Sequence, residues 1–176
     1  MPAGSVIGRR SVLWAGGCAA GLAPFGMPLP SVAAPVVEIR MRGNADGSKV
    51  WYDPVGVLIE PGQILRWINA DPGNAHTCTA YHPRNNGHPL RIPDGAEPWD
   101  SDYLLPGGTF ELRLSVPGVY DYFCIPHEEA GMAGRIVVGR PAGRAEVSAD
   151  TLPEPARRVV PPVAEIVRRG AVGGVP

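Results

Sequence analysis

The sequence predicts an all-β fold in which short strands form a sandwich. Of its 176 residues, 23 are glycine and 21 are proline, and these are spread between short apolar runs. This distribution favours turns between strands over long helices. With 44% hydrophobic residues, the chain can bury the core of one domain of ordinary size.

Seven segments have the two-residue periodicity or the β-branched and aromatic enrichment that is typical of strands. They are Val36–Arg42, Val50–Ile59, Ile64–Asn69, His76–Tyr81, Thr109–Val116, Val119–Cys124 and Arg135–Val138. Turn-forming residues separate several of these segments. In the third segment, alternation places Leu65 and Trp67 on one face, which we expect to face the core.

A long segment without periodicity, His82–Gly108, interrupts the predicted strands and contains five prolines. A connection of this length in a small domain is usually functional or mobile. We expect Trp99, which lies inside the segment, to be a packing anchor.

Residues 141–176 predict a C-terminal extension with two short helices. Thr151 and Glu154 have the spacing of a capping box, so the first helix is expected to begin there and to stop before Pro161. Three apolar residues at helical spacing predict the second helix: Val163, Ile166 and Val167. Gly170 marks its end. The alternative is a disordered tail.

Residues 1–33 have the features of an export signal. Arg9 and Arg10 precede an apolar stretch. Small residues occupy the positions that a signal peptidase recognises, which predicts cleavage after Ala33. The arginine pair favours the twin-arginine route, with general secretion as the alternative. A lipid-bearing Cys18 is less favoured, because no large aliphatic residue stands three places before it.

Composition and charge exclude several kinds of partner. The formal net charge is -1 and no long run of one sign occurs, so we expect no nucleic-acid partner and no polybasic membrane patch. Outside the signal, no apolar run reaches the roughly 18 residues that span a bilayer. The mature chain, 34–176, whose main domain is 34–140, is therefore expected to be soluble, without stable membrane insertion.

Residues with metal-binding chemistry lie close together near the end of this domain. Cys124, His127 and Met132 follow one another at intervals of three and five residues, in a loop between two predicted strands. Thiolate and thioether sulfur favour Cu(I), and imidazole serves both oxidation states of copper. Two histidines, one cysteine and a weak axial methionine are the ligands of blue copper sites. Zinc is less favoured, because its structural sites rarely use thioether sulfur.

A blue copper site requires a second histidine, for which three candidates remain outside the predicted signal. His76 is preferred because it stands where a turn meets a predicted strand, so that a rigid edge can orient its ring. His82 and His88 lie in the irregular segment, where we expect solvated or hydrogen-bonding roles. The predicted ligand set is therefore His76, Cys124, His127 and Met132.

The ligand motif resembles that of the plastocyanin, pseudoazurin and halocyanin group of cupredoxins. The resemblance covers about 36–139 and rests on these motifs: Cys124-x2-His127-x4-Met132, Pro117-Gly118-x-Tyr120-x-Tyr122, Gly134-x-Ile136-Val137-Val138, and Pro61-Gly62-x4-Trp67-x-Asn69 with His76. It implies a Greek-key sandwich that holds one copper ion, with Met132 as the axial ligand. It also implies electron transfer to and from redox proteins that dock near His127.

One residue departs from the family pattern, and three others are close in sequence to the predicted ligands. Thr77 follows His76 where asparagine is more usual, so a hydrogen bond to the Cys124 sulfur is in question. Glu128 and Glu129 indicate either a basic patch on the partner or a solvated acidic pair. Cys78 is expected to be a small buried hydrophobic residue rather than a ligand or a disulfide partner.

The sequence therefore predicts a monomeric, exported one-electron carrier of the periplasm or an equivalent compartment. The alternative is a non-enzymatic copper-binding module for sequestration or delivery, which the lack of a methionine-rich tract makes less favoured. An enzyme is not expected, because no second histidine cluster and no nucleophile with a base are present.

Overall fold

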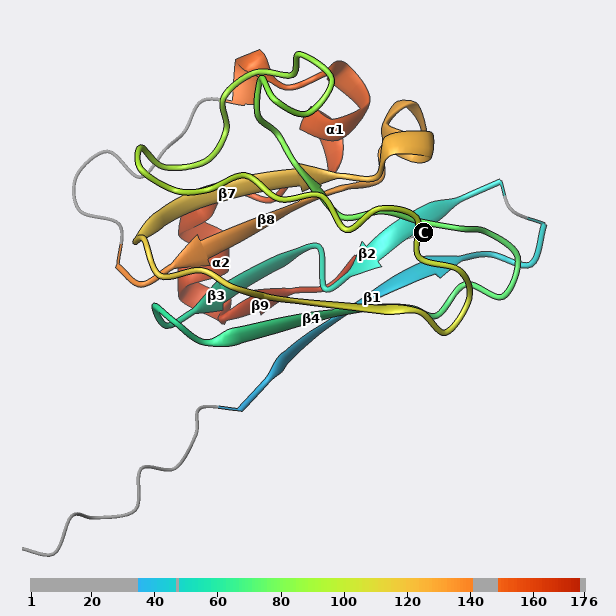
Figure 1. The fold of residues 1–176 in the computed structure, drawn as a ribbon, viewed down its shortest axis with the longest axis horizontal. Coiled ribbons are helices and arrows are strands. Elements are labelled where there is room, and N and C mark those ends of the chain that lie inside the picture. Colours follow the sequence, from blue (N-terminus) through green and yellow to red (C-terminus); the bar gives the residue numbers. More distant parts are fainter. Residues whose placement is uncertain (1–34, 47, 141–148, 175–176) are drawn as a thin grey trace, which may run out of the picture. The chain divides into compact units, whose positions relative to one another are not determined.

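Two β-sheets make up most of the described chain, which in this computed structural model comprises residues 35–46, 48–140 and 149–174 (Figure 1). The predicted export signal, including Cys18, lies outside the described residues. Within them, no helix combines the length and apolar character needed to cross a bilayer. The all-β sandwich with short C-terminal helices is confirmed.

The first sheet has the strand order β2-β1-β4-β6. Its strands are β1 (Val37–Gly43), β2 (Val50–Asp53), β4 (Ile64–Asn69) and β6 (Thr109–Arg113). Strand β1 pairs antiparallel with β2 and parallel with β4, and β4 pairs antiparallel with β6. Leu65 and Trp67 of β4 are fully buried, which confirms the predicted core face.

The second sheet has the strand order β5-β7-β8-β3-β9 and forms the other layer (Figure 1). Its strands are β3 (Gly56–Ile59), β5 (Thr79–Ala80), β7 (Gly118–Phe123), β8 (Ala133–Val138) and β9 (Ala171–Val172). Strand β8 pairs parallel with β3 and antiparallel with β7. Every residue of β8 is buried, because this central strand has the core on one face and the C-terminal helices near the other.

The predicted strand Val50–Ile59 is wrong as a single element. The chain instead forms β2 in one sheet and β3 in the other. Pro54, between them, has no N–H to donate to a strand partner, so a continuous ladder cannot pass through this position. The apolar residues on either side of Pro54 do form strands, but these strands belong to two different sheets.

The predicted strand His76–Tyr81 is much shorter than expected. Only Thr79 and Ala80 pair with β7. His76 instead forms an isolated bridge with Leu104, in which the two residues exchange backbone hydrogen bonds of 3.1 and 2.8 Å. The irregular segment His82–Gly108 thus holds the backbone of a predicted ligand in place, and Trp99 within it is buried as expected.

The C-terminal residues form two short helices, α1 (Glu154–Val159) and α2 (Val163–Arg169). Gly170 ends the second helix, as predicted. The capping box is wrong: Pro153 occupies the cap of α1, and Thr151 ends the short 3₁₀ helix η2 (Ala149–Thr151). Strand β9 follows α2 and pairs with β3, which the sequence did not predict.

A buried ionic cluster joins the irregular segment to the second sheet and to the C-terminal residues. The Asp121 carboxylate, on β7, accepts hydrogen bonds from the guanidinium groups of Arg91 and Arg135 at 2.5–3.0 Å. All three side chains are buried. Arg91 also donates to the Thr151 hydroxyl, and Arg135 donates to the Pro161 carbonyl. Residues 149–174 are therefore packed into the same compact unit as the strands.

Candidate metal centre

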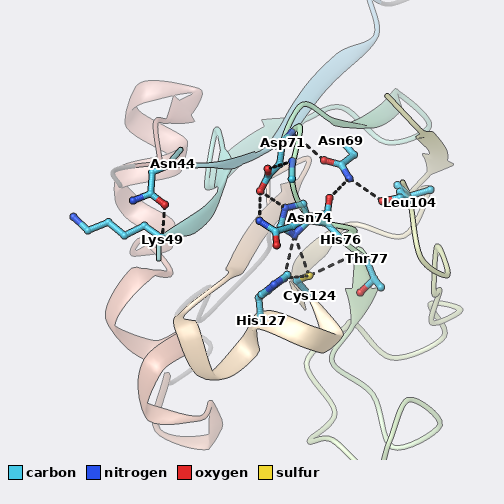
Figure 2. A network of polar contacts seen from close by, with 11 residues as sticks. Asn44, Lys49, Asn69, Asp71, Asn74, His76, Thr77, Leu104, Cys124 and His127 are labelled. Carbon is cyan, nitrogen blue, oxygen red and sulfur yellow. Dashed lines mark hydrogen bonds and ion pairs between the residues drawn. The ribbon is translucent and has the colours of Figure 1, made fainter. Parts of the chain in front are cut away.

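Three metal-binding side chains converge just beyond the end of β7 (Figure 2): those of His76, Cys124 and His127. Nδ1 of His76 lies 3.1 Å from Nδ1 of His127. Sγ of Cys124 lies 3.6 Å from the first nitrogen and 3.4 Å from the second. His76 and Cys124 are fully buried and His127 is partly exposed. The fold thus brings together three of the four predicted ligands.

The loop after β7 folds back on itself, so that its three predicted ligands share a closed set of backbone hydrogen bonds. The N–H of His127 donates to the Cys124 carbonyl, the N–H of Cys124 to the Met132 carbonyl, and the N–H of Met132 to the His127 carbonyl, each at 3.0 Å. The 3₁₀ helix η1 (Ile125–Ala130) forms the turn. Gly131 ends it with a φ of 85°, a conformation that glycine adopts without steric cost.

The Met132 side chain is fully buried in the main core, together with Cys124. Its backbone bonds hold it close to the other residues of the ligand loop. Its assignment as the axial ligand stays a prediction, which the compact form of this loop supports.

Thr77 takes part in the centre through both its backbone and its side chain. Its N–H donates to the Cys124 sulfur at 3.3 Å, which answers the question left by the missing asparagine. Its hydroxyl oxygen accepts from the Ile125 N–H at 2.9 Å and bonds to the Thr79 hydroxyl, which donates to Asp100. Threonine therefore connects the two ligand segments without an amide side chain.

The Asp71 carboxylate contacts the second nitrogen of His76. Its Oδ2 lies 3.0 Å from Nε2, and both side chains are buried. Asn74 Nδ2 and the Gly73 N–H donate to the same carboxylate at 2.9 and 2.8 Å. The Asp71 N–H donates to the Asn69 side chain, so Asp71 is held through both its backbone and its carboxylate.

Burial determines the protonation of the metal-free centre. Burial lowers the pKa of His76, although the neighbouring Asp71 carboxylate opposes this shift. Burial, followed by the nearby His76, lowers the pKa of His127. Burial raises the pKa of the Cys124 thiol to about 11, although hydrogen bonds from Thr77 and His127 oppose this shift. Both imidazoles are thus neutral near pH 7, and a metal ion must displace the thiol proton on binding.

The other histidines lie outside the cluster of donor atoms, as expected. His82 Nδ1 accepts a backbone hydrogen bond in its own turn. The His88 ring packs on Phe123 and Tyr81, with ring centroids 4.4 and 5.4 Å apart. His88 therefore packs beside the residue that precedes Cys124 without joining the donor atoms.

The acidic pair beside His127 divides into an inward and an outward residue. Glu128 accepts a 2.6 Å hydrogen bond from the Tyr81 hydroxyl and lies 3.5 Å from His88, with 12% of its side chain exposed. Glu129 is exposed. Glu128 therefore stabilises the fold around η1, and only Glu129 is openly available to a charged partner.

Cys78 is fully buried in the main core, and burial raises the pKa of its thiol. It forms no disulfide and lies outside the cluster of donor atoms. The prediction that it packs as a small hydrophobic residue is confirmed.

Asp71 is the residue of this centre that the sequence did not reveal. The stretch Asp71–Asn74 has the composition of an ordinary turn. An acidic residue five positions before a candidate histidine ligand was the available signal, and it is a weak one.

The donor set of this centre fits copper. Two neutral imidazole nitrogens and one cysteine sulfur lie within 4.8 Å of one another, inside a largely buried site. Imidazole and thiolate together suit copper, whereas oxygen-rich sets suit magnesium or calcium. The Greek-key sandwich and this centre together place the chain in the class of small copper-binding β-sandwich proteins.

Comparison with known proteins places the chain within that class. Residues 39–139 match the family described as copper binding proteins, plastocyanin/azurin family. The chain belongs to this family, and it is a cupredoxin of the plastocyanin and pseudoazurin group.

Its relatives include a plastocyanin and a pseudoazurin. Plastocyanin of Scenedesmus fuscus is 30% identical over 105 residues, which are 57% of this chain and 99% of the relative. Pseudoazurin of Methylorubrum extorquens is 27% identical over 61% of this chain and 64% of the relative. The crystal structure of pseudoazurin from Methylobacterium extorquens AM1 aligns with a TM-score of 0.48 and 24% identity, over 61% of this chain and 77% of that one.

Proposed function

We propose that this cupredoxin carries single electrons between redox proteins, using one copper ion held by His76, Cys124, His127 and Met132. The observation that carries the proposal is the convergence of two imidazole nitrogens and one cysteine sulfur within 4.8 Å. Bound there, copper supplies a couple that cycles between Cu(II) and Cu(I).

The protein's own residues keep the ligands in one arrangement. His76 is held by its backbone bridge to Leu104, and Cys124 and His127 are held by the backbone bonds of their loop. The Thr77 N–H donates to the Cys124 sulfur and stabilises its thiolate form. A centre that is already shaped before metal binds needs little rearrangement when an electron arrives.

The route of the electron follows from the difference in exposure between the two histidines. His76 is fully buried, whereas His127 is partly exposed. We therefore place the docking of redox partners at the surface near His127, with Glu129 as the adjoining charge. We further propose that the chain from residue 34 onward acts as a monomer after export to the periplasm, with residues 1–33 as the export signal.

Absorption spectra of the copper-loaded chain from residue 34 onward test this proposal. We expect an intense thiolate-to-copper band, which Cys124→Ser removes because oxygen replaces the sulfur ligand. Cys78→Ala is the matched control and keeps the band, because Cys78 lies outside the centre. A copper-loaded wild type without this absorption band would contradict the proposal.

Voltammetry separates electron carriage from copper delivery. A carrier shows reversible one-electron reduction with the copper retained. Rapid transfer of Cu(I) to a chelator, without reversible reduction, would instead identify a delivery module.

A further inference from the structure

A buried carboxylate lies at the side of His76 that does not face the other donor atoms (Figure 2). Asp71 Oδ2 is 3.0 Å from His76 Nε2, and the two side chains are 2% and 0% exposed. The opposite ring nitrogen, Nδ1, faces Cys124 and His127. His76 thus links a negative charge to the proposed copper centre.

This contact fixes the position of the proton on the ring. An ionised carboxylate only accepts hydrogen bonds, so Nε2 of His76 must carry the proton. Nδ1 is then left with its lone pair, directed toward the other donor atoms. Asp71 therefore selects the tautomer that a metal ligand needs.

The fold holds this carboxylate in place from two sides. On its own turn, Asn74 and the backbone of Gly73 donate to its oxygens. On β1, Gly43 leaves the space that the carboxylate fills, because a Cβ at this position would overlap Asp71 Oδ2. Two segments distant in sequence thus make room for one carboxylate behind one histidine.

We infer that Asp71 is a positioning residue, which orients His76 and lowers the reduction potential of the centre. The inference rests on the proposed function. A carboxylate bonded to the far nitrogen of a ligand histidine raises the basicity of the ligand. A more basic ligand, with a negative charge behind it, stabilises Cu(II) more than Cu(I).

The tautomer of His76 can be tested without metal, by ¹⁵N-detected NMR of the metal-free chain. We expect protonation at Nε2 in the wild type and a loss of this preference in Asp71→Ala. Glu111→Gln is the control, because Glu111 is an exposed carboxylate on β6 that pairs with Arg66. A wild-type ring protonated at Nδ1, or an unchanged tautomer in Asp71→Ala, would overturn the assignment.

The effect of Asp71 on the reduction potential is measured with Asp71→Asn. The amide oxygen of this variant still accepts from Nε2–H but carries no charge. We expect the ratio of Cu(I) to Cu(II) at a fixed potential to rise about tenfold, which is about +59 mV for a one-electron couple. Glu111→Gln should leave the potential close to that of the wild type. An equal potential in wild type and Asp71→Asn, with both folded by circular dichroism, contradicts the inference.

Gly43→Ala provides an independent route to the same effect if Asp71→Asn fails to fold. The added methyl group forces the carboxylate away from His76, so the potential should rise in the same direction. An unchanged potential in a folded Gly43→Ala variant counts against the inference. If wild type binds copper without the thiolate band, the proposed function fails, whereas the NMR result still decides whether Asp71 positions His76.

Discussion

At the scale of single residues, the Thr77 hydroxyl connects the two segments that carry the ligands. A directional chain runs from the Ile125 N–H through the hydroxyls of Thr77 and Thr79 to the Asp100 carboxylate. Ile125 follows Cys124, and Thr77 follows His76. The hydroxyl thus joins these ligand segments, in addition to the bond from the Thr77 N–H to the Cys124 sulfur.

Replacing Thr77 tests this connection. Thr77→Val keeps the shape of the side chain but leaves the Ile125 N–H without its acceptor. We expect the free energy of unfolding of the metal-free protein to fall by about 1–3 kcal/mol. Urea unfolding measures this, with Thr77→Ser as the control that retains the hydroxyl. Equal stability of the Val and Ser variants would show that the bond contributes nothing.

At the scale of elements, the Asp121 carboxylate adds side-chain bonds where the backbone of β7 already pairs with β8 and with the irregular segment. It sits on β7 and bonds to Arg135 on β8 and to Arg91 in the irregular segment. These two arginines also reach Thr151 and Pro161. One buried carboxylate thus stabilises the packing of the irregular segment and of the C-terminal residues on the same sheet.

Asp121→Asn removes the charge that compensates two buried guanidinium groups. Breaking a buried ion pair in this way costs about 3–5 kcal/mol, so we expect a loss of unfolding free energy in that range. The matched control Arg66→Gln breaks exposed pairs on β4 and should cost no more than about 1 kcal/mol. Urea denaturation of the metal-free variants compares the two. Similar losses for both would mean that burial does not strengthen this cluster.

At the scale of the whole molecule, the C-terminal residues form two apolar clusters with the second sheet instead of a separate appendage. Six of their side chains are buried against the second sheet: Leu152, Ala156, Val160, Val163, Ile166 and Val172. Strand β9 covers the edge of β3, and α1 packs beside η1 of the ligand loop. The C-terminal residues therefore support the sheet that positions Cys124.

Ending the chain at Arg140 exposes the apolar faces that these side chains cover. Full burial of one large aliphatic side chain contributes about 1.5–3 kcal/mol, so the loss is comparable to the roughly 5–15 kcal/mol that stabilises a typical domain. We expect the shortened chain to unfold at least about 10 °C lower, or not to fold. Thermal circular dichroism measures this, with a chain that ends at Gly174 as the control. Matching midpoints for the Arg140 and Gly174 chains would refute the structural role.

By itself, the sequence determined the features that depend on local pattern. The spacing of Cys124, His127 and Met132 within one loop identified the ligand segment, because residues this close in sequence need only one turn to converge. Alternation identified the core face of β4, and the positive-φ Gly170 marked the end of α2. Each of these features is set by neighbours within a few residues.

Only the tertiary structure decided the features that depend on contacts between distant segments. It divided the Val50–Ile59 pattern between two sheets, replaced the capping box with Pro153, and added β9 to the edge of β3. It also placed Asp71 behind His76, in the space that Gly43 leaves on β1. The physical reason is that short strands and buried carboxylates are stable only with partners that the fold brings from elsewhere in the chain.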